Sequence, residues 1–387
     1  MSISYTQTAP GFSMDNSNTS MSDKFGNLMF YSSGCNILDK NGDILENGDF
    51  INPGIMQDHF CNVDGASPLS QGVIAIPKPE TLYQYYLFNL DLGLPYFQMD
   101  SFLGTAPIKL YVQTIDMSFN NGNGKVINKN QVVLEDTFAR GNIQASRHIN
   151  GQDWWIIVPK SHSNCYFLIL VTPNGIQPPI KICDGKYWGD DDYQGQTVFS
   201  PDGKKYIRIT PKNGLSVFNF SNDDGKLTEI EHLDFLNDTF YAAGVAVSSN
   251  SRFLYVSLRK KLYQFDLRAK KIQDTKILIG EWDGYTDPYA TIFYLCSLAP
   301  DNKIYISGTS SHKYLHVIHA PDSLGLDCRF IQRDIKFDLF NFSSIPNFPN
   351  YRSLTTKVEC DTIINSNYKL IWNNDVNIFP NPTFESV

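Results

Sequence analysis

A few histidines, carboxylates and tryptophans are the residues of this chain that could do chemistry. Arg147 and His148 are adjacent, and Asn150 and Asp153 follow them in a polar segment that ends in two tryptophans. An arginine can bind an anion through paired hydrogen bonds, and a histidine can exchange a proton near neutral pH. We therefore treat these four residues as candidate ligand-binding residues. The alternative is a structural network, in which Asp153 orients His148 or Arg147 and fixes the loop.

The other histidines and the acidic residues do not form a recognisable metal or catalytic motif. His312, His316 and His319 lie in an eight-residue segment, but this segment is typical of a strand, where His316 and His319 would point to opposite faces. Residues 190–192 are consecutive aspartates, which could bind calcium in a loop but lack the spacing of an EF-hand. The chain also lacks a Gly-x-Ser-x-Gly elbow and a phosphate-binding loop. We expect no metal and no cofactor.

The tryptophans could contact a carbohydrate through their flat rings. Trp154 and Trp155 are consecutive, so in a strand they face opposite sides of the sheet, and one of them belongs in the core. Trp282 lies in a Glu-Trp-Asp-Gly segment that is typical of a loop. We expect Trp282 to be an exposed aromatic residue that contacts a ligand.

The elements that would position these residues repeat along the chain. The unit is a strand, a tight turn and a second strand, and residues 197–209, 245–257 and 294–307 are its clearest copies. Looser copies are residues 21–31, 74–83, 155–167 and 344–351. Proline, aspartate, asparagine and glycine at the centres suit tight turns, and the β-branched and aromatic flanks suit strands.

The turns recur at the spacing of propeller blades. We place them at Asp23, Pro79, Ser161, Asp202, Asn250, Asp301 and Asn347. Intervals of 40–50 residues are typical of one blade, and only the interval from Pro79 to Ser161, at 82 residues, is far longer. It holds an insertion near residues 91–107 or an additional blade.

This pattern predicts an all-β fold. We expect residues 1–372 to form a seven-bladed β-propeller of four-stranded antiparallel blades, with the ring closed by pairing strands from the two ends of the chain. The alternative is a two-sheet sandwich, which would show shorter spacing and no higher-order repeat.

Composition excludes several classes of protein. The chain has 387 residues and a formal charge of −8, which argues against a general nucleic-acid binder. Aromatic residues make up 13% and charged residues 19%, which disfavours disorder. No apolar run reaches the roughly 18 residues of a membrane-spanning helix. The seven cysteines are dispersed without a Cys-x-x-Cys motif, which argues against a zinc ribbon. We expect a monomer.

Several segments together carry a resemblance to a known group of proteins. They include the Asp-Trp-Trp sequence of residues 153–155, the Ser-Pro-Asp-Gly turn of residues 200–203 and the Pro-Asn-Phe-Pro-Asn-Tyr sequence of residues 346–351. In these segments, and over most of residues 20–382, the chain resembles secreted Bacteroidota β-propeller proteins that carry a type IX secretion (Por) C-terminal sorting domain. Residues 378–383 resemble the opening strand of that domain, so we expect residues 373–387 to be a linker and the start of a truncated sorting domain.

The resemblance implies export through the type IX secretion machinery to the cell surface or the medium. The start of the chain lacks the features of a signal peptide, so both ends look trimmed. Cys328 and Cys360 match positions where this group shows cysteines, and an oxidising compartment could join them. Two separate buried thiols are the alternative. The group has no established activity.

We expect a non-enzymatic scaffold that binds a protein or a glycan, because a rigid frame with variable loops suits that role. The alternative is a polysaccharide hydrolase or lyase with its site at the channel mouth near Arg147 and His148. A central pocket with a perturbed histidine or a carboxylate pair would favour the enzyme. A shallow or plugged channel would favour the binding module.

Overall fold

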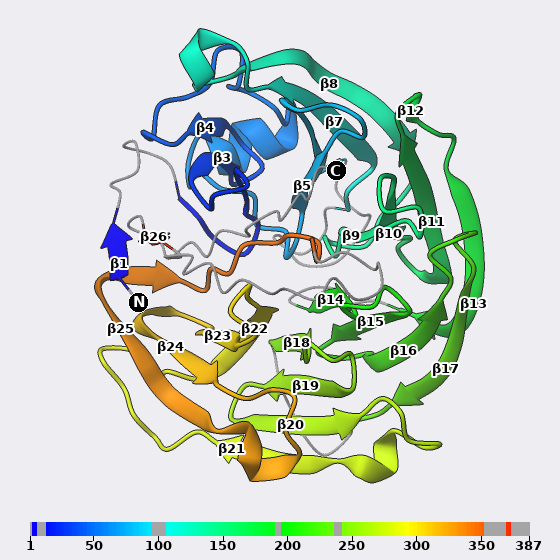
Figure 1. Ribbon diagram of the computed structural model, residues 1–387, viewed down its shortest axis with the longest axis vertical. Coiled ribbons are helices and arrows are strands. Elements are labelled where there is room, and N and C mark those ends of the chain that lie inside the picture. Colours follow the sequence, from blue (N-terminus) through cyan, green and yellow to red (C-terminus); the bar gives the residue numbers. More distant parts are fainter. Residues whose placement is uncertain are drawn as a thin grey trace, which may run out of the picture.

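The computed structural model describes residues 2–5, 13–93, 106–189, 195–235, 242–351 and 369–372. These residues form a ring of small antiparallel sheets around a central axis, which is the architecture of a β-propeller (Figure 1). None of the helices in the described ranges is long and apolar enough to cross a membrane.

Six blades follow one another in sequence order among the described residues. Blade 1 contains β2 (Thr19–Ser22), β3 (Leu28–Ser32) and β4 (Ile37–Asp39); blade 2 contains β5 (Val73–Pro77), β6 (Gln84–Leu90), β7 (Lys109–Asp116) and β8 (Lys125–Glu135). Blade 3 contains β9 (Gln144–Arg147), β10 (Trp154–Pro159), β11 (Ser163–Thr172), β12 (Gly175–Ile176) and β13 (Ile180–Trp188). Blade 4 contains β14 (Gln196–Phe199), β15 (Lys205–Thr210), β16 (Gly214–Phe220) and β17 (Leu227–Leu233).

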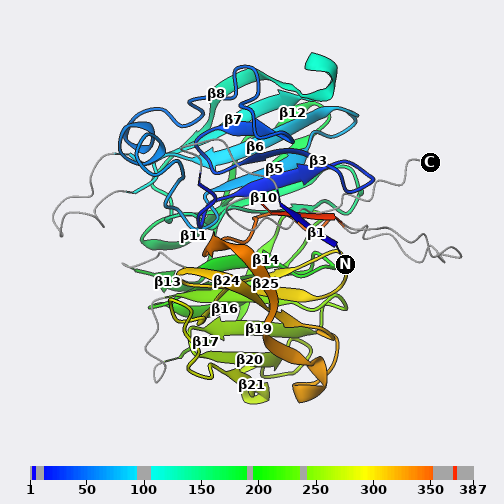
Figure 2. The ribbon, with the colours of Figure 1, turned by 90° about the vertical axis from the view of Figure 1, so that its left-hand side faces the viewer.

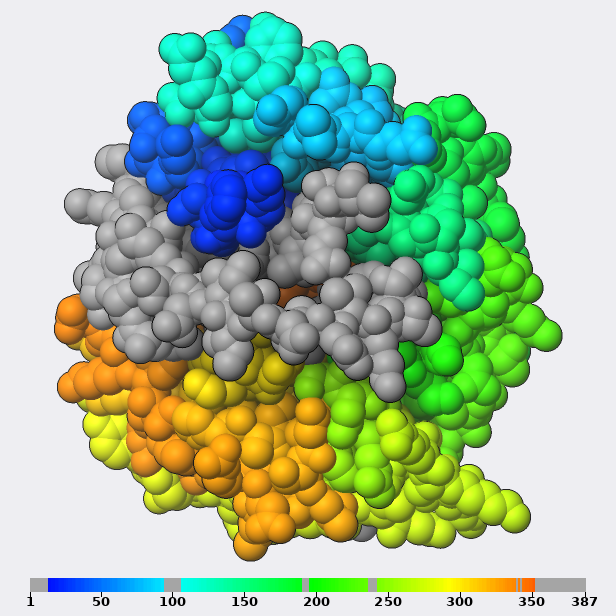
Figure 3. Space-filling view, in the orientation of Figure 1, coloured from blue at the N-terminus to red at the C-terminus, as the bar shows by residue number. Residues whose placement is uncertain are grey.

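The last two blades complete the ring, and Figure 3 shows all the blades as successive coloured sectors on one face. Blade 5 contains β18 (Ala243–Val247), β19 (Phe253–Leu258), β20 (Lys261–Asp266) and β21 (Ile277–Glu281); blade 6 contains β22 (Phe293–Leu298), β23 (Ile304–Gly308), β24 (Ser311–Ile318) and β25 (Phe330–Phe342). The short helices are η1 (Gln57–Cys61), η2 (Asn120–Gly122), η3 (Gln273–Thr275) and η4 (Gly325–Cys328).

The prediction of a propeller is confirmed, but the prediction of seven blades is wrong, since the described residues form six. Residues 344–351, the expected seventh copy, form no hairpin. They form no strand and lie beside the start of β2, since Asn347 N donates to Asn18 O and Thr19 Oγ1 donates to Asn347 O. Pro346 and Pro349 lack the backbone N–H that a ladder of strands requires, which explains why this segment does not join a sheet.

The ends of the chain do pair, as expected, but not as part of a blade. β1 (Ser2–Tyr5) pairs with β26 (Lys369–Trp372) in parallel, in a separate two-stranded sheet. Figure 2 shows β1 at the boundary between the N-terminal and the C-terminal blades. The four-stranded antiparallel pattern holds for blades 2, 4, 5 and 6, whereas blade 1 has three strands and blade 3 has five.

The irregular turn spacing has two structural causes. In blade 3 the turn at Ser161 joins the second and third strands, and the turn equivalent to the others lies at residues 148–153, between β9 and β10. The remaining excess falls in the connection between β6 and β7, residues 91–108, and residues 94–105 of it lie outside the described residues. No additional blade lies between blades 2 and 3 in the described part of the chain.

The turns between the first two strands of a blade are fixed by side-chain hydrogen bonds. In blade 4, Asp202 Oδ1 accepts a bond from Ser200 Oγ at 2.6 Å and one from Lys204 N at 3.1 Å. Gly203 has a φ of 67°, which favours glycine. The Ser-Pro-Asp-Gly sequence therefore predicts this turn for a specific physical reason.

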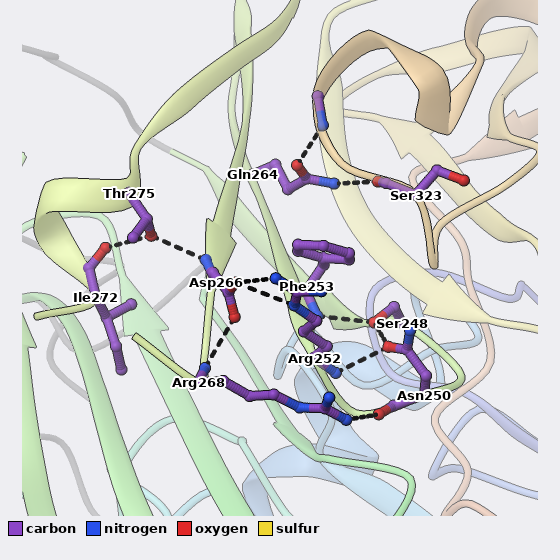
Figure 4. Close-up of polar contacts among 11 residues, drawn as sticks. Ser248, Asn250, Arg252, Phe253, Gln264, Asp266, Arg268, Ile272, Thr275 and Ser323 are labelled. Atoms are coloured by element: carbon purple, nitrogen blue, oxygen red, sulfur yellow. Dashed lines mark hydrogen bonds and ion pairs between the residues drawn. The ribbon is translucent and has the colours of Figure 1, made fainter. Parts of the chain in front are cut away.

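In blade 5 an aspartate at the end of β20 joins two turns (Figure 4). Asp266 Oδ2 accepts bonds from Arg252 Nε at 3.0 Å and Nη2 at 2.8 Å, and Asp266 Oδ1 accepts one from Arg268 N at 2.9 Å. Arg268 Nη2 donates to Asn250 O at 3.3 Å, which connects the turn after β18 with the turn after β20.

Two disulfides cross-link the described part of the chain. Cys35 bonds to Cys61 in blade 1, and Cys165 on β11 bonds to Cys183 on β13. Cys328 is buried and forms no disulfide with a described residue. Its expected partner, Cys360, lies outside the described residues, so that pairing stays a prediction.

Candidate functional site

The axis of the ring is occupied by residues 344–351, which follow β25. Asn347 lies at the centre of this segment, and its backbone N–H donates to Asn18 O at 2.7 Å. Asn347 Nδ2 donates to Val73 O at 3.0 Å and to Ile143 O at 2.9 Å, so one side chain holds the first strands of blades 2 and 3. The predicted central channel is therefore plugged at this level.

Glutamine side chains complete this plug. Asn347 Oδ1 accepts bonds from Gln71 Nε2 at 3.0 Å and from Gln144 Nε2 at 3.2 Å. Gln71 also binds the backbone of Thr197, and Gln196 binds the backbone of Cys296 across the channel. All of these side chains are buried. The channel is closed by neutral side-chain amides that bond to one another and to the edges of the inner strands. We call these four residues the amide layer (Gln71, Gln144, Gln196 and Asn347).

A cavity of about 210 Å³ lies on the channel axis beside the amide layer. Its walls include the ends of the inner strands β14, β18 and β22, the turn prolines Pro201 and Pro300, and the aromatic rings of Phe199, Phe348 and Tyr351. This is below the roughly 300 Å³ at which drug-sized ligand sites begin, so the cavity has room for about one ring or one side chain.

The described residues that line the cavity are uncharged. Its described lining contains no aspartate, glutamate, histidine, lysine or arginine. Burial raises the pKa of the Cys296 thiol to about 12 and also raises that of the Tyr351 phenol, so both groups stay protonated at neutral pH. A charged ligand would lose its hydration there without gaining a partner of opposite charge. The cavity therefore suits a neutral group.

The candidate residues 147–153 are brought together in the turn between β9 and β10. Asn150 Oδ1 accepts bonds from Gln152 N and Asp153 N, each at 3.0 Å, and Asn150 Nδ2 donates to Asp153 Oδ2 at 2.9 Å. His148 Nε2 lies 2.9 Å from Asp223 O in blade 4. These bonds match the structural alternative, a polar network that fixes the turn against the next blade. A ligand-binding role for these residues stays a prediction.

The Arg147 side chain contacts both the turn that follows β9 and the first residue of β10. Its Nη1 donates to Gly151 O, and its guanidinium carbon lies 4.5 Å from the centre of the Trp154 ring. Burial lowers the pKa of Arg147 from its ordinary value. The Trp154 ring in turn meets the Tyr351 ring edge-on at 5.7 Å, which connects Arg147 with the wall of the cavity.

Trp282 is half-buried rather than exposed, and its contact with a ligand stays a prediction. Its ring packs against the apolar residues between blades 5 and 6, and Nε1 donates to Tyr285 O at 3.3 Å. The exposed rings of this loop are Tyr285, at 39% exposure, and Tyr289, at 55%. The edge of a neighbouring blade covers the Trp282 ring. The residues around Trp282 in the sequence do not indicate this contact.

The remaining histidines of the sequence analysis are structural. His312 and His316 are buried in blade 6, and burial lowers their pKa to about 4 and about 3. His319 lies apart from them and pairs with Asp334 at 2.8 Å. The described residues contain no group of three or more histidine, cysteine or acidic side chains that could hold a metal ion, and the aspartates 190–192 lie outside those residues.

The amide layer was missed by the sequence analysis, although a signal for it exists. Gln144 and Gln196 are each the first residue of an inner strand, and Gln71 lies two residues before β5. A glutamine that opens two successive inner strands is the sequence pattern that points to this layer, which charged and aromatic residues do not mark. The sequence predicts a turn at Asn347, whereas the structure places this residue on the axis of the ring.

Comparisons with known proteins concern the fold. No protein-family model matches the chain, and no curated protein matches it. Among solved structures, a functionally unknown protein from Desulfotomaculum acetoxidans is 13% identical, with 90% of each chain covered and a TM-score of 0.42. A putative 6-phosphogluconolactonase from Bacteroides fragilis is 13% identical over 80% of this chain and 90% of that one, with a TM-score of 0.41. The periplasmic gluconolactonase of Pseudomonas aeruginosa is 13% identical over 69% and 85%, with a TM-score of 0.34. Likeness at this level says nothing about the ligand of this chain.

Proposed function

We propose that this chain is an exported β-propeller that acts as a binding module for a protein or a glycan. One observation carries the proposal: the channel is plugged by neutral amides and by residues 344–351, and the cavity that remains is lined by no ionised side chain among the described residues. Such a site can bind a ligand through shape and hydrogen bonds. Its described lining offers no acid or base that could transfer a proton at neutral pH.

The alternative, a polysaccharide hydrolase or lyase at the channel mouth, has less support from the geometry. Hydrolysis of a glycosidic bond uses two carboxyl groups on either side of that bond. In the described turn of residues 147–153, Asp153 is the one carboxylate, and it is buried and bonded to Asn150. The Nε2 atom of His148 lies at hydrogen-bond distance from the backbone oxygen of Asp223 in blade 4.

Export is part of the proposal. The disulfides Cys35–Cys61 and Cys165–Cys183 support it, because disulfides form and persist mainly in oxidising compartments. The type IX route rests on the resemblance of the sequence. It predicts that the full-length gene product, expressed in a type IX-competent host, reaches the medium or the cell surface, and that it stays in the periplasm when that machinery is inactivated.

Binding is tested by screening the purified protein against polysaccharide and peptide arrays, followed by analysis of every ligand for chemical change. We expect saturable binding of a ligand that is recovered unchanged. A ligand that is shortened or modified would contradict the binding-module function and direct attention to the channel mouth. A Tyr289→Ala variant tests the exposed loop, and Tyr83→Ala, another exposed tyrosine in a distant turn, is its control.

A further inference from the structure

The inner strand of each blade presents one edge to the channel. In an antiparallel edge strand, alternate residues direct both N–H and C=O away from the sheet. In β14 the residue directed to the channel is Thr197, because its N–H and C=O both bind Gln71. Three residues further on, Ser200 N donates to Lys205 O within its own blade, as the alternation requires. Phe199 is therefore also directed to the channel.

The same alternation holds for the inner strands of blades 5 and 6. Val245 N and Cys296 N are directed to the channel, since both donate to Gln196 Oε1. Ser248 N and Ala299 N donate within their own blades, to Phe253 O and Lys303 O. The next residues directed to the channel are therefore Val247 in β18 and Leu298 in β22.

The amide layer shows what these strand edges bind. Gln196 makes a two-point contact with Cys296: Cys296 N donates to Oε1 at 3.0 Å, and Nε2 donates to Cys296 O at 2.6 Å. Val245 N adds a second donor to Oε1 at 2.9 Å. Gln71 repeats the two-point contact on Thr197, at 2.7 and 3.0 Å. In both cases a primary carboxamide takes the place of a neighbouring strand.

Two residues further along these strands, the corresponding backbone N–H and C=O groups face the cavity. Phe199, Val247 and Leu298 all line it, about 7 Å from the amide layer at the rise of two strand residues. Among the described residues, no hydrogen bond engages the channel-directed N–H or C=O of these three. Because these groups face the cavity and bond to no described residue, they are available to a ligand that enters it.

The space between β18 and β22 also widens toward the cavity. At Gly244 the strands touch, because a methyl group there would overlap the carbonyl oxygen of Tyr294. At Val245 and Cys296 they are separated by the width of one carboxamide, that of Gln196. At Val247 and Leu298 they open into the cavity.

We infer that the cavity binds the primary carboxamide of a glutamine side chain from a partner polypeptide. The carboxamide oxygen accepts the N–H of Leu298, with that of Val247 as the second donor, and the carboxamide NH₂ donates to Leu298 C=O. This contact repeats the one that Gln196 makes with Cys296, two residues earlier in β22. The apolar walls of the cavity cover the methylene groups of the bound glutamine side chain. The inference rests on the proposed binding function and names its ligand class.

The chemistry separates this ligand from close relatives. A glutamate side chain would bring a charge into a neutral cavity, which is unfavourable. The secondary amide of an N-acetyl sugar is trans, so its N–H and C=O point in opposite directions and cannot make the two-point contact with one residue. The site therefore discriminates in favour of a primary carboxamide.

The test is backbone-amide NMR of the intact protein with ¹⁵N-labelled leucine, valine and phenylalanine. The probe is N-acetyl-glutamine N-methylamide, and the matched control is the same compound with an N,N-dimethylated side chain. We expect saturable shifts at Leu298, Val247 and Phe199, with a Kd on the order of millimolar for so small a probe, and at least tenfold weaker binding of the control. Equal binding of the two compounds, or no shift at these residues, would overturn the inference.

Two variants test the contact directly. Leu298→Pro removes a backbone N–H that is directed to the channel and makes no bond to the neighbouring strand. Proline is tolerated at such positions of an edge strand. Leu298→Ala is the control, because it keeps the N–H. We expect at least a tenfold loss of probe binding in the first and less than a threefold change in the second. If Leu298→Pro does not fold, Ser297→Leu is the second test, because Ser297 is half-buried and lines the cavity. We expect the larger side chain of Ser297→Leu to fill the cavity and weaken probe binding, whereas the control Ser297→Ala should leave probe binding unchanged.

The outcomes also separate the inference from the proposed function. A ligand from the arrays that binds the wild type and Ser297→Leu equally well would overturn the assignment of the cavity and leave the binding-module function standing. A probe response at Leu298 without any array ligand would support the cavity assignment and count against the wider proposal.

Discussion

Asn347 joins the segment on the ring axis to the inner strands of blades 2 and 3. Its side-chain amide is buried and makes four hydrogen bonds, with Gln71, Gln144, Val73 and Ile143. Asn347→Ala would leave these groups unpaired in the interior, and we expect it to lower the free energy of unfolding by about 3 kcal/mol. The measurement is urea denaturation followed by tryptophan fluorescence.

Asn219→Ala is a matched control for Asn347→Ala, because Asn219 is exposed and its amide oxygen accepts a bond from Lys205 alone. We expect its effect to stay within about 0.5 kcal/mol. Equal effects of the two substitutions would contradict the role of Asn347.

The buried histidines predict how stability depends on pH. Burial lowers the pKa of His312 to about 4 and that of His316 to about 3, whereas both titrate normally in the unfolded chain. The unfolded state therefore binds more protons as the pH falls below about 6.5, and each histidine destabilises the fold by about 2 kcal/mol at pH 5 relative to pH 7. Burial raises the pKa of Asp15 to about 6, which opposes this loss by about 1 kcal/mol.

Thermal or urea unfolding between pH 7 and pH 5 measures this dependence. His316→Asn keeps a polar acceptor near the N–H of Arg333 and removes one titrating group. Its loss of stability between the two pH values should be smaller than that of the wild type. An unchanged pH profile in this variant would show that another group controls the acid sensitivity.

At the scale of elements, the third blade carries a covalent clamp. Cys165 and Cys183 lie opposite each other on β11 and β13 and join an additional outer strand to the sheet. Replacing both by alanine removes a loop closure of 18 residues, and we expect a loss of about 3 kcal/mol in unfolding free energy. The melting temperature of the wild type should fall with reductant, and that of the double variant should fall less.

Cysteine mapping by mass spectrometry, after alkylation without reductant, is the control for this prediction. The buried thiol of Cys296 should react with the alkylating agent only after unfolding. Modification of Cys165 in the native, unreduced protein would contradict the disulfide.

At the scale of the whole molecule, the segment after β25 unites the ring. Residues 344–351 bond to blades 1, 2 and 3 through Asn18, Thr19, Val73, Ala75 and Ile143. A chain that ends at residue 343 should therefore lose cooperative unfolding, because blade 6 is no longer tied to the N-terminal blades. A chain that ends at residue 372 should retain the melting transition of the full sequence, since we expect residues 373–387 to be a linker and the start of a truncated sorting domain.

Differential scanning calorimetry distinguishes these truncations. A chain ending at residue 343 that unfolded in one transition at the wild-type temperature would show that residues 344–351 do not hold the ring together. A chain ending at residue 372 that failed to fold would contradict the boundary between the propeller and the linker.

The class of fold and its repeating unit can be predicted from the sequence. The Ser-Pro-Asp-Gly turn and its relatives act locally, through the side chain of Asp202 and the conformation of Gly203, so residues a few positions apart suffice to predict them. Buried runs such as β10 and β18 are apolar throughout because neighbouring blades cover both faces, and this too is legible in the sequence.

The tertiary structure alone decided the number of blades, the path of residues 344–351 and the cavity. Asn347 resembles a turn residue in its local context, and only its position on the axis brings it to Gln71, more than 270 residues away in the chain. Trp282 is covered by a blade edge that local sequence does not describe. Contacts across the channel join strands from different repeats, and their geometry depends on how the blades close around one axis, which no short stretch of sequence encodes.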